Sequence, residues 1–148
     1  MKVTVRSPRG LKYEAEGAES VLLPGATGEM GVLPDHTPVL TPLDIGAMTV
    51  RIEGREEVVA LAGGFAEIGP DKVEVLADAA ERAEDIDRGR AQSARERAEE
   101  RLKKARSQAG EGEEVDLERA LQALRRAVNR IEVTREHRQS VAEGRKRS

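Results

Sequence analysis

The sequence predicts an N-terminal antiparallel β-sandwich followed by a C-terminal antiparallel α-helical hairpin, and two patterns carry this prediction. From Lys2 to Asp78, short runs rich in β-branched residues alternate apolar and polar positions, and proline, glycine or charged pairs separate them. After Asp78, glycine and proline become rare and apolar residues recur at spacings of three and four. We therefore expect residues 1–83 to form the sandwich and residues 84–148 to form the hairpin with a basic tail.

The first half contains seven clear strand segments, which indicate seven to nine strands in all. They are VTVRS, KYEAE, SVLLP, MGVLP, AMTVRIE, EEVVALAG and KVEVLAD. Strands at this spacing indicate an antiparallel sandwich or a flattened barrel. No helix of crossover length follows any of these segments, so antiparallel pairing is favoured over a parallel α/β sheet. Between Gly28 and Gly46, Pro34 and Pro38 bar central-strand pairing at their own positions. We expect Gly28, Gly31 and Gly46 to permit turn dihedral angles.

The second half predicts two helices joined by the segment AGEGEEVD, whose glycines end the first helix and whose Asp116 is the expected N-cap of the second. The apolar face of the first helix is mostly alanine: Ala91, Ala94, Ala98, Leu102 and Ala105. The second helix should run from about Leu117 to about Ala142, with its apolar face at Leu117, Ala120, Leu121, Leu124, Ala127, Val128 and Ile131. An alanine face buries little area, so the hairpin can rearrange; the alternative is a hairpin that stays folded.

Composition excludes several classes of function. The 148 residues contain no cysteine, which excludes disulfides, thiolate zinc sites and cysteine nucleophiles. The net charge of −3 gives no global attraction to nucleic acid or membrane, and no nucleic-acid partner is expected. The N-terminus lacks the apolar region of a secretory signal, and no stretch approaches the about 18 apolar residues of a membrane span. The expected protein is soluble and cytoplasmic.

A search for catalytic motifs finds no P-loop, dinucleotide-binding fingerprint, zinc-protease motif or nucleophile elbow, and no metal site. Asp35 and His36 are neighbours, but adjacent side chains in an extended segment seldom face each other. A loop histidine bonded to the backbone is therefore favoured over a small enzyme that uses this pair. The basic tail after Arg135 has no interleaved aromatic residue for stacking on bases, which favours a solvated helix end.

Four arginines stand apart from the other charged residues by their spacing. Arg126 and Arg130 are four residues apart on the second helix, and Arg90 and Arg97 are one heptad apart on the first. In a closed hairpin these guanidinium groups converge beside Asp87. Guanidinium suits bidentate binding of phosphate, so an anion site is one interpretation and a plain charged surface is the other.

Several motifs, in the correct order from Val3 to about Val133, closely resemble the epsilon-subunit family of F-type ATP synthases, whose mitochondrial counterpart is the delta subunit. The resemblance rests on Gly28-Glu29-x-Gly31, Leu33-Pro34-x-His36-x-Pro38, Gly63-Gly64-Phe65 and Val75-Leu76-Ala77-Asp78. It implies a ten-stranded sandwich followed by the helical hairpin. It also implies a rotor subunit that performs no chemistry and requires no cofactor.

The resemblance further implies partners and a location. The sandwich would attach to the gamma subunit and rest on the c ring, coupling proton-driven rotation to ATP synthesis. Glu29, Met30 and Gly31 would face the c ring, and His36 with Thr37 would lie near gamma. The helices would contact the alpha and beta subunits when they extend and inhibit ATP hydrolysis, or fold down against the sandwich. The complex would hold the chain at the cytoplasmic face of the cell membrane as a peripheral protein.

In family members whose hairpin binds ATP, the motif is Ile-Asp-x-x-Arg-Ala on the first helix with arginines on the second. The matching residues here are Ile86, Asp87, Arg90, Ala91, Arg97, Arg126 and Arg130, with Glu81 as a further candidate. The resemblance implies that ATP, as a regulatory ligand, bridges the helices. Its adenine end would lie near Asp87 and Arg90, and its phosphates near the other arginines. The competing interpretation is a free-standing β-sandwich binding module with a helical arm for a peptide or nucleic-acid partner.

Overall fold

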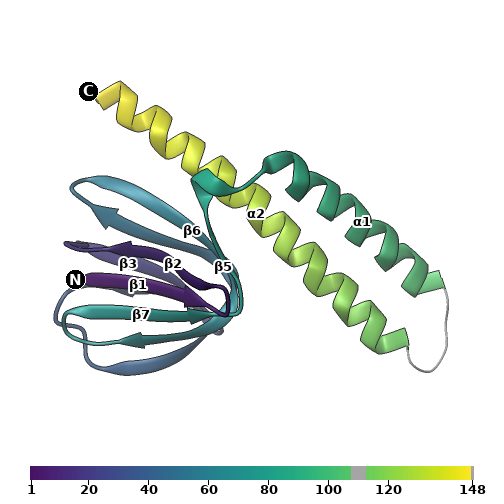
Figure 1. Ribbon diagram of the computed structural model, residues 1–148, viewed down its shortest axis with the longest axis horizontal. Helices are drawn as coiled ribbons and strands as arrows, with labels where there is room; N and C mark the ends of the chain where they lie inside the picture. The colour runs from purple at the N-terminus through teal and green to yellow at the C-terminus, as the bar shows by residue number, and fades with distance from the viewer. Residues whose placement is uncertain (108–112, 148) are drawn as a thin grey trace.

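A computed structural model describes residues 1–107 and 113–147, which form a β-sandwich with two long antiparallel helices beside it (Figure 1). The strands are β1 (Lys2–Ser7), β2 (Gly10–Ala15), β3 (Ser20–Gly25), β4 (Gly28–Val32), β5 (Val39–Ile52), β6 (Arg55–Ile68), β7 (Lys72–Ala77) and β8 (Ala80–Arg82). A short 3-10 turn (Ala83–Asp85) leads to the helices α1 (Arg88–Ser107) and α2 (Glu113–Arg147). The predicted fold class, a sandwich followed by a helical hairpin, is confirmed.

The strands hydrogen-bond in the order β2-β1-β7-β6-β5-β3-β4, and β8 pairs with β6. Among the described residues the pairings are antiparallel except that of β1 with β7, which is parallel. The parallel pair joins strands from opposite ends of the sandwich sequence. Alternation of polar and apolar residues carries no information on strand direction, so the sequence could not show it.

The two central strands, β5 and β6, are 14 residues long each, about twice the segments that the sequence indicated. Residues Val59 to Leu61 of β6 pair with β8, and Gly64 to Ile68 pair with β7. β5 pairs with β3 and β6, and β6 pairs with β5, β7 and β8, so each remains one continuous strand. The described residues contain eight strands and not the ten that the resemblance implied.

Close packing, and not a turn, explains Gly46. Gly46 lies inside β5 without a positive φ, and a Cβ there would be 2.5 Å from the Cβ of Pro24. Gly31 lies inside β4, also without a positive φ, so turn dihedral angles are the wrong explanation for both residues. Gly28 does have a φ of 136°, as expected for a turn glycine.

The sandwich core consists mainly of valine, leucine and isoleucine, as the near absence of aromatic residues requires. Leu23, Met48, Leu61 and Ile68 are its largest fully buried side chains. A second, smaller apolar cluster joins the sheet to the linker and both helices, and we call it the seat cluster. Its members are Val58, Ala60, Ala83, Ile86, Ala91, Ile131 and Val133.

The two helices pack along the alanine face that the sequence indicated on α1, where Ala91, Ala98 and Leu102 are buried. On α2 the prediction is partly wrong, because Leu121 and Val128 are more than a third exposed. The C-terminal part of α2 instead buries a residue the sequence analysis missed, Val133. Val133 is buried because α2 extends past the start of α1 and packs its middle part on the sheet (Figure 1).

The bounds of α2 also differ from the prediction. The helix begins at Glu113, so Asp116 lies in its first turn and is not its N-cap, and the helix continues to Arg147. Gly110 and Gly112 lie outside the described residues, so their role in ending the first helix stays a prediction. In the part of the chain that the structure describes, no helix is long and apolar enough to cross a membrane.

Candidate functional site

Asp87 begins α1 as its N-cap. Its Oδ1 accepts a hydrogen bond from the backbone N–H of Arg90 at 3.0 Å, and its carbonyl accepts one from the N–H of Ala91 at 3.0 Å. The Arg90 guanidinium Nε lies 3.7 Å from Asp87 Oδ2, and this side chain is 85% exposed. Capping is a role that the sequence analysis did not assign to Asp87, although an aspartate just before a helical apolar pattern is its usual signal.

Ile86 and Ala91, two residues of the predicted ATP motif, belong to the seat cluster and do not face solvent. Ala91 is fully buried and Ile86 is 9% exposed. At Ala91 the helix approaches its neighbours too closely for a larger side chain without repacking. These residues therefore fix where α1 begins, and the motif is in part a packing motif.

The predicted charged residues come together at the start of α1 and on the facing part of α2. Asp87, Arg90, Arg97 and Arg130 line one open hollow of about 680 Å³. An adjoining hollow of about 260 Å³ is lined by Arg97, Arg126 and Arg130, and also by Arg101, Ala94, Ala98, Ala123 and Ala127. The convergence expected from the helical spacing is thus present. Arg101 was missed, although it lies one turn after Arg97 on the same face.

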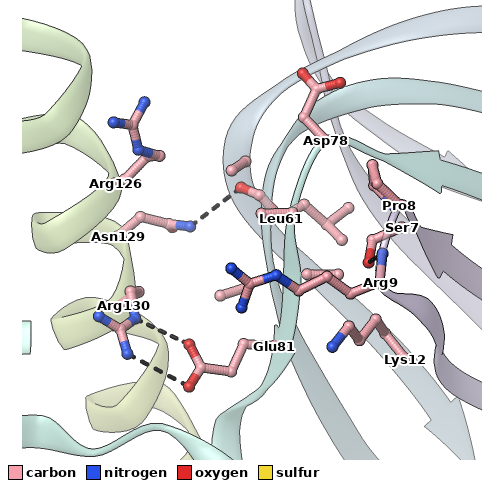
Figure 2. A pocket seen from close by; sticks show the side chains of 14 residues that line it. Ser7, Pro8, Arg9, Lys12, Leu61, Asp78, Glu81, Arg126, Asn129 and Arg130 are labelled. Carbon is pink, nitrogen blue, oxygen red and sulfur yellow. Dashed lines mark hydrogen bonds and ion pairs between the residues drawn. The ribbon is translucent and has the colours of Figure 1, made fainter. Parts of the chain in front are cut away.

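Glu81 of β8 holds Arg130 in a two-point ion pair (Figure 2). Arg130 Nε donates to Glu81 Oε2 at 2.9 Å, and Nη2 donates to Oε1 at 3.3 Å. The two side chains are 28% and 35% exposed, so this is a partly buried, charge-assisted contact. An anion that approached Arg130 would therefore share it with Glu81 or displace Glu81.

A second ion pair fastens α2 to β5. Arg125 Nη2 donates to Asp44 Oδ1 at 2.9 Å. The pKa of Asp44 lies below its usual range, first because the backbone N–H of Ile45 donates to the carboxylate and then because Arg125 is close. One helical turn after Arg125, Asn129 also contacts the sheet.

Asn129 of α2 forms hydrogen bonds to the backbone of the sheet. Its Nδ2 donates to the carbonyl of Gly46 at 3.0 Å and lies 3.4 Å from the carbonyl of Leu61. A side-chain amide can satisfy both carbonyls because it carries two N–H donors. The sequence analysis missed this contact and the Asp44 pair. The only sequence feature that could have indicated these contacts is that Arg125 and Asn129 share one face of α2 with the apolar residues.

The predicted docking residues fall into two groups. Glu29, Met30 and Gly31 lie in β4, where Glu29 and Gly31 are exposed but Met30 packs against the sandwich core. His36 and Thr37 lie in the connection from β4 to β5, and His36 Nδ1 is 2.7 Å from the carbonyl oxygen of Thr37. Met30 and His36 are half-buried, whereas Glu29, Gly31 and Thr37 are exposed.

The connection between β4 and β5 is a shaped corner. Pro34 and Pro38 lie outside the strands, as predicted, and the backbone N–H of Asp35 donates to the carbonyl of Pro70 at 2.7 Å. Within the described residues no interaction joins the side chains of Asp35 and His36. His36 contacts a backbone carbonyl, which supports the structural role over the catalytic one.

An exposed apolar stripe crosses β5, β6 and β7, and the sequence analysis did not identify it. It consists of Leu40, Phe65 and Leu76, which are 69%, 54% and 64% exposed. Phe65 lies opposite both Leu76 and Pro42, and Leu40 is two residues before Pro42, so the three side chains share one face. Large apolar side chains gathered on one exposed face are typical of a protein-docking surface.

Comparison with known proteins covers both halves of the chain. The family model described as ATP synthase, Delta/Epsilon chain, beta-sandwich domain matches residues 1–83. The model described as ATP synthase, Delta/Epsilon chain, long alpha-helix domain matches residues 84–135. Together the two models include the sandwich, the seat cluster and the hollows between the helices.

Individual relatives agree with these models. The ATP synthase epsilon chain of Bacillus velezensis is 44% identical over 133 residues, which are 90% of this chain and 96% of the relative. That of Moorella thermoacetica is 47% identical and covers 88% and 93% of the two chains. A chain in the Euglena gracilis mitochondrial ATP synthase structure has the same fold, with a TM-score of 0.68 and 23% identity over 83% of this chain and 74% of that one. This chain is therefore a member of the ATP synthase delta/epsilon family, of the bacterial epsilon type.

Proposed function

We propose that this chain is the regulatory central-stalk subunit of an F-type ATP synthase, in which the sandwich is a docking domain and the helical hairpin a regulatory one. It performs no chemistry itself and requires no cofactor. The observation that carries the proposal is the division of the molecule into two separately built parts. The sandwich has its own complete core, and the hairpin rests on it through the small seat cluster and a few polar contacts.

The docking role is supported by the exposed apolar stripe of Leu40, Phe65 and Leu76. His36 and Thr37 come just before β5, close in sequence to Leu40. We assign this side of the sandwich to the gamma subunit and the exposed edge at Glu29 and Gly31 to the c ring. Binding to these partners would hold the chain at the cytoplasmic face of the membrane without a membrane span of its own.

The regulatory role follows from how little holds the hairpin down. When α1 and α2 leave the seat cluster, they can extend toward the alpha and beta subunits and inhibit hydrolysis. The test is ATP hydrolysis by the reconstituted complex with the chain intact or cut after Asp85. A cut after Asp78 would remove β8, which pairs with β6, whereas the later cut leaves all eight strands. Equal hydrolysis by both complexes contradicts the inhibitory role.

We further propose that ATP binds the folded hairpin at the hollows lined by Asp87, Arg90, Arg97, Arg126 and Arg130. The arginines supply the charge for the phosphates, and Asp87 with Arg90 lies toward the adenine. Ile86, Ala91 and Glu81 take part indirectly, since the first two position α1 and Glu81 positions Arg130. ATP stabilises this arrangement only as far as it binds it better than the extended one.

Calorimetric titration of the isolated protein with ATP tests this site. We expect saturable heat at millimolar ATP or below, and a clearly weaker affinity for Arg97→Gln. The matched control is Lys104→Gln, one heptad later on the same helix and exposed, which lines none of the hollows. No saturable heat for the unaltered protein, or equal losses in both variants, rules out the proposed site.

A further inference from the structure

A third cavity lies on the sandwich side of α2 (Figure 2). It shares Arg126 and Arg130 with the proposed ATP hollows, but its sandwich side has no role in the proposed function. Its volume is about 590 Å³. The turn between β1 and β2, the middle of β6, the segment that leads into β8, and α2 enclose it. Its charged lining residues are Arg9, Lys12, Asp78, Glu81, Arg126 and Arg130.

The lining carries an excess of positive charge. Four cations face two carboxylates, which leaves a formal charge of +2. Glu81 is already paired with Arg130. Among the described residues the side chains of Arg9, Lys12 and Arg126 have no ion pair, and Figure 2 shows the Arg9 guanidinium directed across the cavity toward α2.

Unpaired cations gathered around a cavity favour an anion of high charge density. A volume of about 590 Å³ falls within the about 300 to 1,000 Å³ of small-molecule sites. Guanidinium groups bind phosphate oxygens at two points, and an ammonium group adds a point charge.

We propose that this cavity is a binding site for a polyphosphate group, held by Arg9 and Lys12 from the sandwich and by Arg126 and Arg130 from α2. The site adjoins the proposed ATP hollows and shares Arg126 and Arg130 with them. Arg9 and Lys12 line the cavity and neither hollow, whereas Arg97 and Asp87 do not line the cavity. A ligand here would join the β1–β2 turn to α2 and therefore stabilise the docked hairpin by linkage.

The test is a calorimetric titration with inorganic pyrophosphate at low ionic strength, where exposed charges are least screened. The unaltered full-length chain should bind pyrophosphate saturably. Replacing both sandwich cations, Arg9→Gln with Lys12→Gln, should weaken binding by about tenfold or more, because two charge-assisted contacts are lost. The control removes the same charge from the β5–β6 hairpin, with Arg51→Gln and Arg55→Gln, and should leave the affinity within about twofold of the unaltered chain.

The Arg97→Gln variant separates this inference from the proposed ATP site. It should keep its pyrophosphate affinity, because Arg97 does not line the cavity. In the same variant, added ATP will displace pyrophosphate if a nucleotide tail is the source of the polyphosphate, and will not if the free anion is. Either result supports the cavity site and identifies its ligand.

Three results overturn the inference. The first is no saturable binding of pyrophosphate at millimolar concentration. The second is equal affinity in the unaltered chain and the Arg9→Gln, Lys12→Gln variant, which would show that the anion binds elsewhere. The third is loss of pyrophosphate binding in Arg97→Gln, which would place the anion between the helices. Unchanged far-ultraviolet circular dichroism verifies that the variants, whose substitutions are on the surface, remain folded.

Discussion

The sandwich and the helical hairpin differ in what holds them together. The sandwich core joins 19 buried residues from seven strands and their connections, whereas the seat cluster joins seven, three of them alanines. Area buried determines most of the stability of each part, so the seat is much the weaker. Polar contacts from Arg125, Asn129 and Arg130 supplement it. We therefore expect the hairpin to separate from the sandwich while the sandwich stays folded.

The largest effect should come from the sandwich core. Leu23 is fully buried, and Leu23→Ala should lower the free energy of unfolding by about 3 to 5 kcal/mol through lost burial and the cavity left behind. Denaturant unfolding followed by circular dichroism of the strands measures it. The control is Leu22→Ala in the same strand, where the side chain is 38% exposed and the loss should be much smaller. Similar losses for both variants would show that the core is not the source of stability.

The second effect should be confined to the hairpin. Ile131 is buried in the seat cluster, and Ile131→Ala should weaken docking of α2 by about 2 kcal/mol or more. Amide hydrogen exchange should then accelerate in α1 and α2 and stay unchanged in the strands. Val128→Ala, at a partly exposed position three residues earlier, is the control. Faster exchange throughout the sandwich would mean that the two parts unfold together.

The third effect concerns a single polar contact. Asn129→Ala removes the donor to the carbonyls of Gly46 and Leu61 and should cost about 1 kcal/mol of docking. Exchange rates of the α2 amides report it. Gln122→Ala, one heptad earlier on the same helix, should change them less. If the Asn129 variant matches this control, the hydrogen bond to the sheet contributes nothing to docking.

The sandwich was more predictable from sequence than the hairpin, because it buries many more apolar residues in one core. In β3 and β7 alternation reflects a dry core on one side, so strand existence and burial follow from the pattern. The switch of β6 from β8 to β7, and the parallel pair of β1 with β7, depend on partners distant in sequence. On α2, Leu121 and Val128 fit the helical period but are more than a third exposed.

The candidate site was also predictable from the sequence only in part. The spacing along α1 and α2 predicted that Arg97, Arg126 and Arg130 would converge in a closed hairpin. In the fold the three side chains line one hollow. Nothing in the spacing indicated that Arg130 is held by Glu81, a contact between residues 49 positions apart. Arg9 also became a candidate only when the fold placed the β1–β2 turn beside α2.

The smallest effect should be a pH dependence of docking at Glu136. Its pKa is raised above the usual 4.5, first by partial burial and then by the carboxylates of Glu132, Glu29 and Glu56. The docked state thus binds the proton more tightly than the free helix does. Docking is favoured below about pH 4.5 and loses stability as pH rises through the raised pKa. Glu136→Gln should remove this loss and strengthen docking at pH 7.

The gain should stay below about 1 kcal/mol, because the carboxylates are partly solvated. Exchange rates of α2 amides, corrected for the intrinsic pH dependence of exchange, should depend less on pH between 4.5 and 7 in Glu136→Gln than in the unaltered chain. Glu118→Gln, which removes a charge from an exposed position on the same helix, shows how much of the change is net charge alone. An unchanged pH dependence in Glu136→Gln would mean that the sandwich carboxylates of Glu29 and Glu56 do not act on docked α2. Docking would then depend only on the seat cluster and the contacts of Arg125, Asn129 and Arg130.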